Sequence, residues 1–423
     1  MAEPQYTRRG TLRTVGSGFA VGSLATLGTG TGAATQTTAE TVIVNVGYAS
    51  ESGRRAALSR ASTVDHEFGF DALTARIPES EIDTLAAHRD IRYVEEDRTL
   101  GGIVTPQIQP RQQVGEHRVP YGVSVTGADA AAERGYTGSG ADVAVLDTGI
   151  DSTHPDLATN RGKGTAFVPG VSDIEELGLP AGQDDDVRVS HGTHVAGVVG
   201  ANDNDTGVVG VSPAATLHAV KVLVGVLGGG SAASIAAGVE FVADQGWDVA
   251  NLSLGKSGQI DVLADAVTDA YERGVLLVAA AGNDGLLEND PPASDAESTV
   301  SYPAAFEEVI AVGATDRNDE LAAFSSVGPE VELVAPGTDV LSTALPINIY
   351  SNAEEPFNRY IELSGTSFAA PHVAGAGALL MGDADLSNVE ARERLRETAA
   401  DVGLREVQQG HGRLDVAAAL GVE

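Results

Sequence analysis

The sequence predicts an α/β protein: a doubly wound, mainly parallel β-sheet with helices on both faces, preceded by a small α+β domain. The alternation of its elements favours this fold, and its composition indicates a globular chain with a core of small aliphatic residues. From Val119 onward, short apolar runs typical of buried strands alternate with longer stretches typical of helices. The apolar residues are mostly small, because 42% of the 423 residues are hydrophobic while only 4% are aromatic and 51 are glycine.

Residues 1–35 are interpreted as an export signal. Arg8 and Arg9 precede a weakly apolar stretch, Val15–Leu27, and small residues end at Ala33-Ala34. This pattern resembles a twin-arginine signal, in which Thr11 replaces a common aromatic residue; a disordered tail is the alternative. Such a signal implies secretion of the folded protein. No later run reaches the length of about 18 apolar residues that a membrane span needs.

Residues 36–103 are predicted to form a separate small domain. Its expected strands and helices follow the order βαββαβ, which is typical of a small split βαβ sandwich. The strands are Thr41–Val46, Asp65–Phe70, Ala72–Ile77 and Ile91–Val94, and the helices are Arg54–Arg60 and Pro78–His88. From Gly101 to Gly115, Gly, Pro and Gln replace any periodic pattern, so residues 104–118 are interpreted as a linker that contains a cleavage zone.

Residues 119–423 form the main domain, in which strands and helices alternate. Strands are predicted at Asp142–Leu146, Leu217–Leu223, Val249–Leu252, Val275–Ala280, Val309–Val312 and Val331–Ala335, and helices include Ala232–Gln245 and Val262–Arg273. In a sheet of this kind, functional groups belong at the carboxyl ends of the strands.

Three motifs fall at such places. Asp147 ends the first core strand, His191 begins a helix, and Ser367 lies just before a predicted helix from Ala369 to Leu380. Pro371 then fits the first turn of that helix, where its missing N–H needs no partner. Each residue alone has another explanation: a turn aspartate, a packed histidine or an N-cap serine. All three together, each flanked by glycines, predict nucleophilic catalysis.

The residue types fit that chemistry. A serine hydroxyl becomes a nucleophile when a base such as His191 takes its proton, and the base then protonates the leaving group. Asp147 would orient the imidazole and stabilise its charged form. Asn283 follows the strand Val275–Ala280 and, together with the Ser367 N–H, would donate to a developing oxyanion.

The stretches around these residues, Ala144–Asp151, Ser190–Gly197 and Gly365–Gly375, resemble the subtilisin-like serine proteases, or subtilases. The resemblance extends from Val119 to the C-terminus. Together with the acidic composition and the propeptide-like ending Tyr93–Asp97, it is strongest to the halolysin-like proteases of haloarchaea. It implies a sheet of seven strands, a propeptide that serves as folding template and intramolecular inhibitor, and a secreted, autoprocessed serine endopeptidase.

The resemblance also implies which residues bind a polypeptide substrate. Gly229, Gly230 and Ser253-Leu254-Gly255 would flank the substrate backbone as β-strand partners. Ala280, Ala281 and Gly282 would line a roomy apolar S1 pocket, which implies broad specificity with large apolar P1 residues preferred. Ser301 replaces a common glycine at the pocket floor and would narrow it, and Asp284 adds a negative charge at the rim.

A structural calcium ion is implied in the same way. The segment 202–208 is rich in the hard oxygen donors that calcium prefers. The implied ligands are the side chains of Asp156 and Asn204 and the carbonyls of Asn202, Thr206 and Val208. A polar turn without an ion is the alternative. His117 stands where the family has a glutamine ligand, which Gln112 or Gln113 could replace. Asp184-Asp185-Asp186 is interpreted as a solvated loop rather than a second cation site.

Charge and cysteine content exclude several functions. The formal net charge is −34, and residues 105–423 hold 16 basic against 47 acidic residues, a net −31. Nucleic-acid binding requires a basic face, so it is not expected. Adaptation to high salt, where self-repulsion is screened, explains the charge better than binding of basic partners. The absence of cysteine excludes disulfides, thiolate metal sites and thiol catalysis.

Two other functions use the same motifs. One is a catalytically inactive subtilase-like module that binds or scaffolds, which the intact Asp147, His191, Ser367 and Asn283 disfavour. The other is an esterase or amidase, which is disfavoured because such an enzyme does not need a groove suited to an extended peptide. We therefore expect a calcium-supported, monomeric endopeptidase that has no membrane contact once its signal is removed.

Overall fold

The computed structural model describes residues 40–102, 117–167, 184–186, 190–224, 228–285, 298–345 and 359–422. The predicted signal and residues 104–116 of the predicted linker lie outside these ranges. The described residues all belong to one compact unit. Among the described residues, no helix has both the length and the apolar character needed to cross a membrane.

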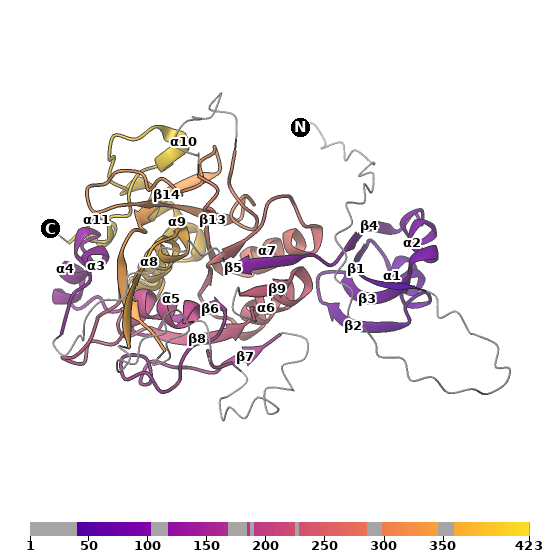
Figure 1. The fold of residues 1–423 in the computed structure, drawn as a ribbon, viewed down its shortest axis with the longest axis horizontal. Coiled ribbons are helices and arrows are strands. Elements are labelled where there is room, and N and C mark those ends of the chain that lie inside the picture. Colours follow the sequence, from indigo (N-terminus) through magenta and orange to yellow (C-terminus); the bar gives the residue numbers. More distant parts are fainter. Residues whose placement is uncertain are drawn as a thin grey trace, which may run out of the picture. The chain divides into compact units, whose positions relative to one another are not determined.

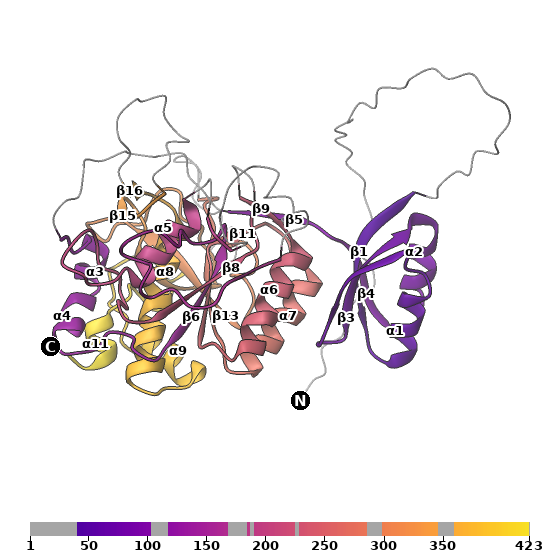
Figure 2. The ribbon, with the colours of Figure 1, turned by 90° about the horizontal axis from the view of Figure 1, so that it is seen from below.

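The first part of the unit is a four-stranded antiparallel sheet with the order β2-β3-β1-β4. Its elements are β1 (Thr41–Tyr48), α1 (Glu51–Leu58), β2 (Thr63–Phe68), β3 (Ala72–Pro78), α2 (Glu79–Ala86) and β4 (Ile91–Glu96), which is the predicted βαββαβ order. Both helices lie on the same face of the sheet (Figure 2). Val46, Leu73, Ile77 and Leu85 are fully buried between the sheet and the helices.

The main domain is built on a seven-stranded sheet, as predicted (Figure 1). Every neighbouring pair of strands is parallel. The strand order is β14-β13-β12-β10-β6-β8-β7, with β6 (Asp142–Asp147), β7 (Thr165–Ala166), β8 (Thr216–Lys221), β10 (Val249–Leu252), β12 (Leu276–Ala280), β13 (Val309–Thr315) and β14 (Val331–Pro336). The two-residue edge strand β7 was not predicted.

Helices cover both faces of this sheet. Side chains of successive strand residues point to opposite faces, so Val143 and Val145 of β6 pack in one core cluster while Ala144 and Leu146 pack in the other. The first cluster includes α5 (His191–Gly200) and α8 (Thr366–Ala378), and the second includes α6 (Ala232–Gln245) and α7 (Asp261–Glu272). The remaining helices are α3 (Tyr121–Val125), α4 (Ala128–Glu133), α9 (Asn388–Glu397), α10 (Glu406–Gln409) and α11 (Val416–Leu420).

The helix after Ser367 differs from the prediction. Helix α8 begins at Thr366 rather than Ala369, and a π-helical turn, Leu379–Asp383, follows it. Pro371 is therefore the sixth residue of the helix and lies beyond its first turn. The expectation that its missing N–H needs no partner is wrong.

A short strand that was not predicted precedes the predicted linker. Residues 99–102 form a strand, β5 (Thr99–Gly102), in a small sheet with the order β11-β5-β9. Its neighbours are β9 (Gly229–Ser231) and β11 (Leu254–Gly255), and both pairings are antiparallel. A separate two-stranded sheet joins β15 (Val340–Thr343) to β16 (Tyr360–Leu363).

Candidate active site

Asp147 and His191 form a buried pair at the carboxyl end of β6, an interior strand of the sheet. The Nδ1 atom of His191 lies 2.8 Å from Oδ1 and 2.9 Å from Oδ2 of Asp147. Asp147 is completely buried, and His191 is 3% exposed. Because a carboxylate accepts hydrogen bonds, this contact places the imidazole proton on Nδ1 and leaves Nε2 as the basic nitrogen.

The first turn of α5 is fixed by side chains that come from outside the helix. Ser190, the residue before the helix, makes no capping bond with its side chain. Instead, the Gly192 N–H donates to Thr148 Oγ1 at 3.0 Å. A Cβ atom on Gly192 would lie 2.3 Å from the Gly149 carbonyl oxygen and 3.1 Å from Asp147, so glycine permits this close approach of helix and strand end.

His191 differs electrostatically from the buried histidines beside it. Burial lowers the pKa of His191, but the Asp147 carboxylate more than offsets this, so its pKa lies above the usual value. By contrast, burial lowers the pKa of His194 to about 3 and that of His372 to about 4. The three imidazoles share two helices, and among them His191 is the one whose surroundings favour the protonated form.

Ser367 is the second residue of α8, completely buried at the helix start. In a regular helix, the carbonyl of residue 367 would accept from the N–H of residue 371, which proline lacks. The hydroxyl of Ser253 replaces that donor, with its Oγ 2.7 Å from the Ser367 carbonyl oxygen. In return, the Ser367 hydroxyl donates to the Ser253 carbonyl at 3.2 Å. Asn251 Nδ2 donates to Ser253 Oγ at 2.9 Å and so holds this link in place.

His191, the expected proton acceptor for Ser367, makes no hydrogen bond through Nε2 among the described residues. This nitrogen is buried. The Phe368 ring, next in the chain after Ser367, lies 5.3 Å from the His191 ring, centroid to centroid. Catalytic hydrogen bonds are often unformed in a protein without substrate, and a rotation of the Ser367 hydroxyl away from Ser253 would redirect its proton.

Asn283 lies beside the start of α8. Its Oδ1 accepts from the backbone N–H and from the hydroxyl of Thr366, both at 3.0 Å. These two bonds fix which end of the amide faces the helix. The NH₂ end is therefore the one that could donate to an oxyanion next to Ser367.

The predicted substrate-flanking residues line a slot that β5 occupies. Leu100 lies opposite Gly230, and Gly101 lies between Gly229 on one side and Gly255 on the other. Leu254 lies opposite Gly102. The chain therefore places its own residues 99–102 as the middle strand between the two segments expected to bind a peptide.

The residues expected in the S1 pocket also come together. Ala280 ends β12, and Ala281 and Gly282 follow it. A Cβ on Gly282 would lie 2.8 Å from Ser301 Oγ and 2.7 Å from Ser326 Oγ, so both hydroxyls adjoin this segment. Ser301 is 4% exposed, whereas Asp284 is exposed. Ser326 was not predicted from the sequence, where no motif marks it.

The predicted calcium ligands cluster in part. Asp156 is completely buried, and it has no ion pair with Lys or Arg among the described residues. Its carboxylate accepts from the Val208 N–H at 3.1 Å and from Asn204 Nδ2 at 3.2 Å. Asn204 thus faces Asp156 with its nitrogen, while its oxygen accepts from Thr206.

A buried carboxylate without a basic partner fits a hard cation, because an uncompensated buried charge is costly. The donor set is nonetheless mixed, since the Asn204 oxygen is turned away from Asp156. The described residues include no group of three or more acidic, His or Cys side chains arranged to hold a metal ion. His117 Nε2 lies 3.4 Å from Oδ1 of Asp203, a residue of the same segment 202–208.

The expectation of a solvated loop at Asp184–Asp186 is wrong. Asp185 and Asp186 are 8% and 3% exposed. Arg161 forms ion pairs with Asp184 and Asp185, and Lys221 Nζ donates to the Asp185 carbonyl at 2.6 Å. These basic partners come from distant parts of the chain, and a run of three aspartates gives no sign of them.

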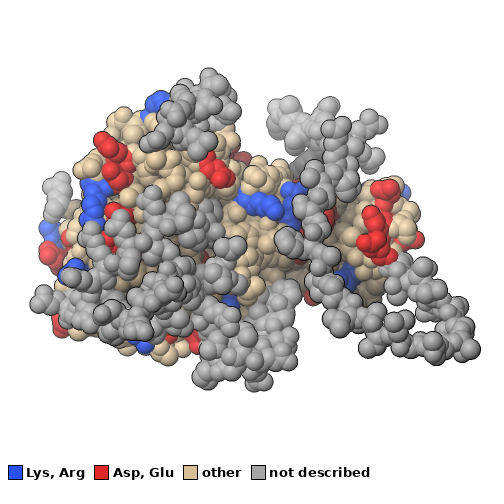
Figure 3. Space-filling model, in the orientation of Figure 1, with Lys and Arg blue, Asp and Glu red and all other residues tan. Residues whose placement is uncertain are grey.

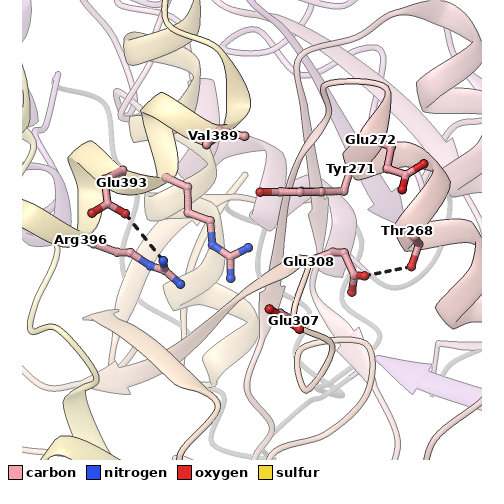
Figure 4. Close-up of a pocket in the computed structure, with 9 residues that line it drawn as sticks. Thr268, Tyr271, Glu272, Glu307, Glu308, Val389, Glu393 and Arg396 are labelled. Carbon is pink, nitrogen blue, oxygen red and sulfur yellow. Dashed lines mark hydrogen bonds and ion pairs between the residues drawn. The ribbon is translucent and has the colours of Figure 1, made fainter. Parts of the chain in front are cut away.

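A surface cavity of about 430 Å³ lies elsewhere, between α7, α9 and the residues before β13 (Figure 4). The Thr268 hydroxyl donates to Glu308, and Arg396 pairs with Glu393. Glu308 precedes β13, so the cavity lies near the amino ends of the strands, whereas Asp147 and Asn283 lie at the carboxyl ends. None of the predicted site residues lines it.

The buried Asp–His pair, the serine at a helix start and the slot that accepts a strand between β9 and β11 define a serine hydrolase built to hold an extended peptide. Comparison with known proteins gives the family. Residues 138–412 match the Subtilase family. The chain is 43% identical over 340 residues to an alkaline protease of Shouchella clausii, and this alignment covers 80% of this chain and 77% of the relative. It is 46% identical over 286 residues to Subtilisin Savinase of Lederbergia lenta, and this alignment covers 67% of this chain and 93% of the relative.

A third relative is Subtilisin DY of Bacillus licheniformis, 42% identical over 302 residues, which covers 71% of this chain and 98% of the relative. The chain belongs to the subtilase family and is a serine endopeptidase.

Proposed function

We propose that this chain is the precursor of a secreted, salt-adapted subtilase of the halolysin type, which removes its own propeptide. The observation that carries the proposal is the position of β5. The last described residues of the propeptide lie in the peptide slot next to Ser253, whose carbonyl accepts from the nucleophile Ser367. A propeptide held this way is both an inhibitor and the first substrate.

In the proposed mechanism, Ser367 Oγ attacks the scissile carbonyl while its proton passes to His191 Nε2. Asp147 holds the imidazole through Nδ1 and stabilises the imidazolium that forms. The Asn283 NH₂ and the Ser367 N–H stabilise the oxyanion. His191 then gives its proton to the leaving amine, and an acyl-enzyme on Ser367 remains. Water, deprotonated by His191, releases the carboxylate product and restores the serine hydroxyl.

Residues 36–103 act as the propeptide in this proposal, as both folding template and inhibitor. Acidic side chains attach it to two helices of the catalytic domain. Glu95 accepts from the N–H groups of Asp261 and Val262, at 3.0 and 2.9 Å, at the start of α7. Asp97 accepts from the Ala233 N–H at the start of α6, at 3.0 Å. Negative charge at these positions complements both helix dipoles.

Substrates are proposed to be unfolded or extended polypeptides, with large apolar P1 residues preferred. The small residues Ala280, Ala281 and Gly282 support a roomy apolar pocket, and the hydroxyls of Ser301 and Ser326 narrow its floor. An inactive binding module is not favoured, because Asp147 and His191 keep a geometry suited to catalysis.

A calcium ion is proposed to stabilise the segment 202–208. Asp156 and the carbonyls of Asn202, Thr206 and Val208 would hold it, and it would balance the buried Asp156 charge without taking part in peptide hydrolysis. The net charge of −34 supports the proposed salt adaptation, and the arginine pair near the N-terminus supports secretion. We propose a monomer that binds neither nucleic acid nor membranes.

The proposal is tested by producing the full chain and a Ser367→Ala twin and determining the N-terminus of each by mass spectrometry. The described strand β5 ends at Gly102, opposite Leu254. We therefore expect wild type to be cut shortly after Gly102, and the twin to stay uncut. Trimming of the twin produced alone would show that another protease does the processing.

A further inference from the structure

Asp186 lies next to the two catalytic groups Asp147 and His191, yet no motif assigns it a role. Its Oδ2 accepts from the backbone N–H of Thr193 at 3.3 Å and from the Thr193 hydroxyl at 3.0 Å. Thr193 is the third residue of α5, where an N-cap side chain usually accepts. Ser190, which has a left-handed φ of 62°, instead accepts from the Leu345 N–H through its hydroxyl. Asp186 therefore supplies the cap that the helix lacks.

The backbone around Asp186 packs against the loop that carries Asp147. Gly149 has a φ of 105°, and a Cβ there would lie 2.5 Å from the Asp184 carbonyl oxygen and 2.7 Å from the Asp186 nitrogen. The Thr193 hydroxyl also accepts from the Asp151 N–H at 3.1 Å. Asp186, the start of α5 and the loop after β6 are thus tied to one another.

Charges from three elements face Asp186. Asp147 lies at the end of β6, His191 at the start of α5, and Lys221 at the end of β8, opposite Asp147 in the strand register. Lys221 is 4% exposed and attracts the carboxylates of the 184–186 segment. His191 itself faces Asp147, Asp186 and the neutral His194.

We propose that Asp186, balanced by Lys221, is a positioning residue of the active site: it caps the helix that carries His191 and supplies a second buried negative charge beside it. This inference rests on the proposed peptidase activity.

The Asp186 charge shifts the pKa of His191 in a defined direction. A negative Asp186 favours the imidazolium, as Asp147 does, and so raises the pKa of His191. Burial, followed by repulsion from Asp147, raises the pKa of Asp186 to about 6, so it is ionised above that pH. Because His191 must be neutral to accept the serine proton, kcat/KM falls as pH drops through the His191 pKa. Removing the Asp186 charge moves that fall to lower pH.

The test compares mature wild type with Asp186→Asn and Asp186→Ala on a peptidyl p-nitroanilide with phenylalanine at P1, between pH 5 and 10. The asparagine oxygen can still accept from Thr193, so Asp186→Asn should keep kcat within about tenfold of the wild-type value. The acidic midpoint of its kcat/KM profile should move down by about 0.5 pH units or more. Asp186→Ala loses the cap as well and should lower kcat further, with KM little changed. Asp184→Asn, whose carboxylate pairs with Arg161, is the matched control and should leave the midpoint in place.

An acidic midpoint in Asp186→Asn equal to that of wild type would overturn the inference. If Asp186→Asn melts below the assay temperature, Thr193→Val tests the inference in its place. This variant keeps the Asp186 charge but loses the hydroxyl that donates to the Asp186 carboxylate. A lowered kcat with an unchanged midpoint is then expected, and an unchanged kcat would contradict the positioning role. An inactive wild type would instead overturn the proposed function, so the two failures are distinguishable.

Discussion

Phe368 lies directly after Ser367, the proposed nucleophile, and contacts two imidazoles. Its ring is completely buried, with its centroid 5.3 Å from that of His191 and 4.6 Å from that of His194. A methionine at this place would bring an oxidisable thioether next to the serine. The chain contains only two methionines and no cysteine.

We therefore expect the enzyme to resist peroxide. After exposure to hydrogen peroxide at millimolar concentration, wild type should retain most of its peptidase activity, whereas Phe368→Met should lose most of its own, because a sulfoxide oxygen would crowd the active site. Activity is measured on the same p-nitroanilide before and after treatment. Equal losses in both proteins would mean that oxidation acts at another place.

At the scale of residues, the sequence predicts the chemistry better than the supporting contacts. Asp147, His191 and Ser367 are recognisable because short glycine-flanked motifs surround them. Asp186 and Ser253 support them through contacts that join distant segments, with Thr193 and Ser367 respectively. Only Ser253 was singled out in advance, as a substrate-binding residue. Its replacement of the N–H missing at Pro371 follows from the helix start, which the sequence places three residues too late.

At the scale of elements, Glu95 is the contact between the proposed propeptide and the catalytic domain that is most open to test. Removing a helix cap costs about 1 kcal/mol, which corresponds to about a fivefold weaker association. In Glu95→Ala, the delay between cleavage of the full chain and the appearance of activity should shorten by about that factor, because the cut propeptide dissociates faster. Mass spectrometry times the cut, and p-nitroanilide hydrolysis times the activity.

Glu96→Ala is the control for this experiment. Glu96 is the exposed neighbour of Glu95 on β4 and caps no helix. It should leave the delay as in wild type. A delay in Glu95→Ala that matches the control would contradict the assigned role of the cap.

A second prediction at this scale concerns the calcium ion proposed at the segment 202–208. An ion that binds only the folded protein raises its stability by mass action, so a chelator should lower Tm. The rate of p-nitroanilide hydrolysis measured at once, before any unfolding, should not change, because the proposed chemistry needs no metal. Identical melting with calcium and with chelator would remove the calcium assignment.

Elements with strong local signals were predicted well. Helix α6 has the predicted bounds, because Ser231 caps its start and Gly246, with a φ of 68°, ends it. Strand β10 also matches. Strand β5 was missed because its Gly-Gly end has no strand preference of its own. It exists through pairing with β9 and β11, and those partners lie more than a hundred residues away in the chain.

At the scale of the whole molecule, the charge should make the fold depend on salt. Acidic and basic side chains are scattered over the visible face rather than gathered in one patch (Figure 3), and the net charge is −34. Screening extends over about 3 Å at 1 M salt but about 10 Å at 0.1 M. Dilution to 0.1 M should therefore reduce activity and helical circular dichroism over hours. Both signals unchanged after days would contradict salt adaptation.

The central claim is that Ser367 is a nucleophile activated by His191. It is tested most directly by treating the matured protein with a serine-directed phosphonyl fluoride and locating the adduct by peptide mass spectrometry. We predict one adduct, on Ser367, that abolishes peptidase activity in proportion to labelling. A His191→Ala protein matured by added wild-type enzyme and then separated from it should label much more slowly. Full activity in protein labelled at Ser367, or labelling that does not depend on His191, would contradict the account.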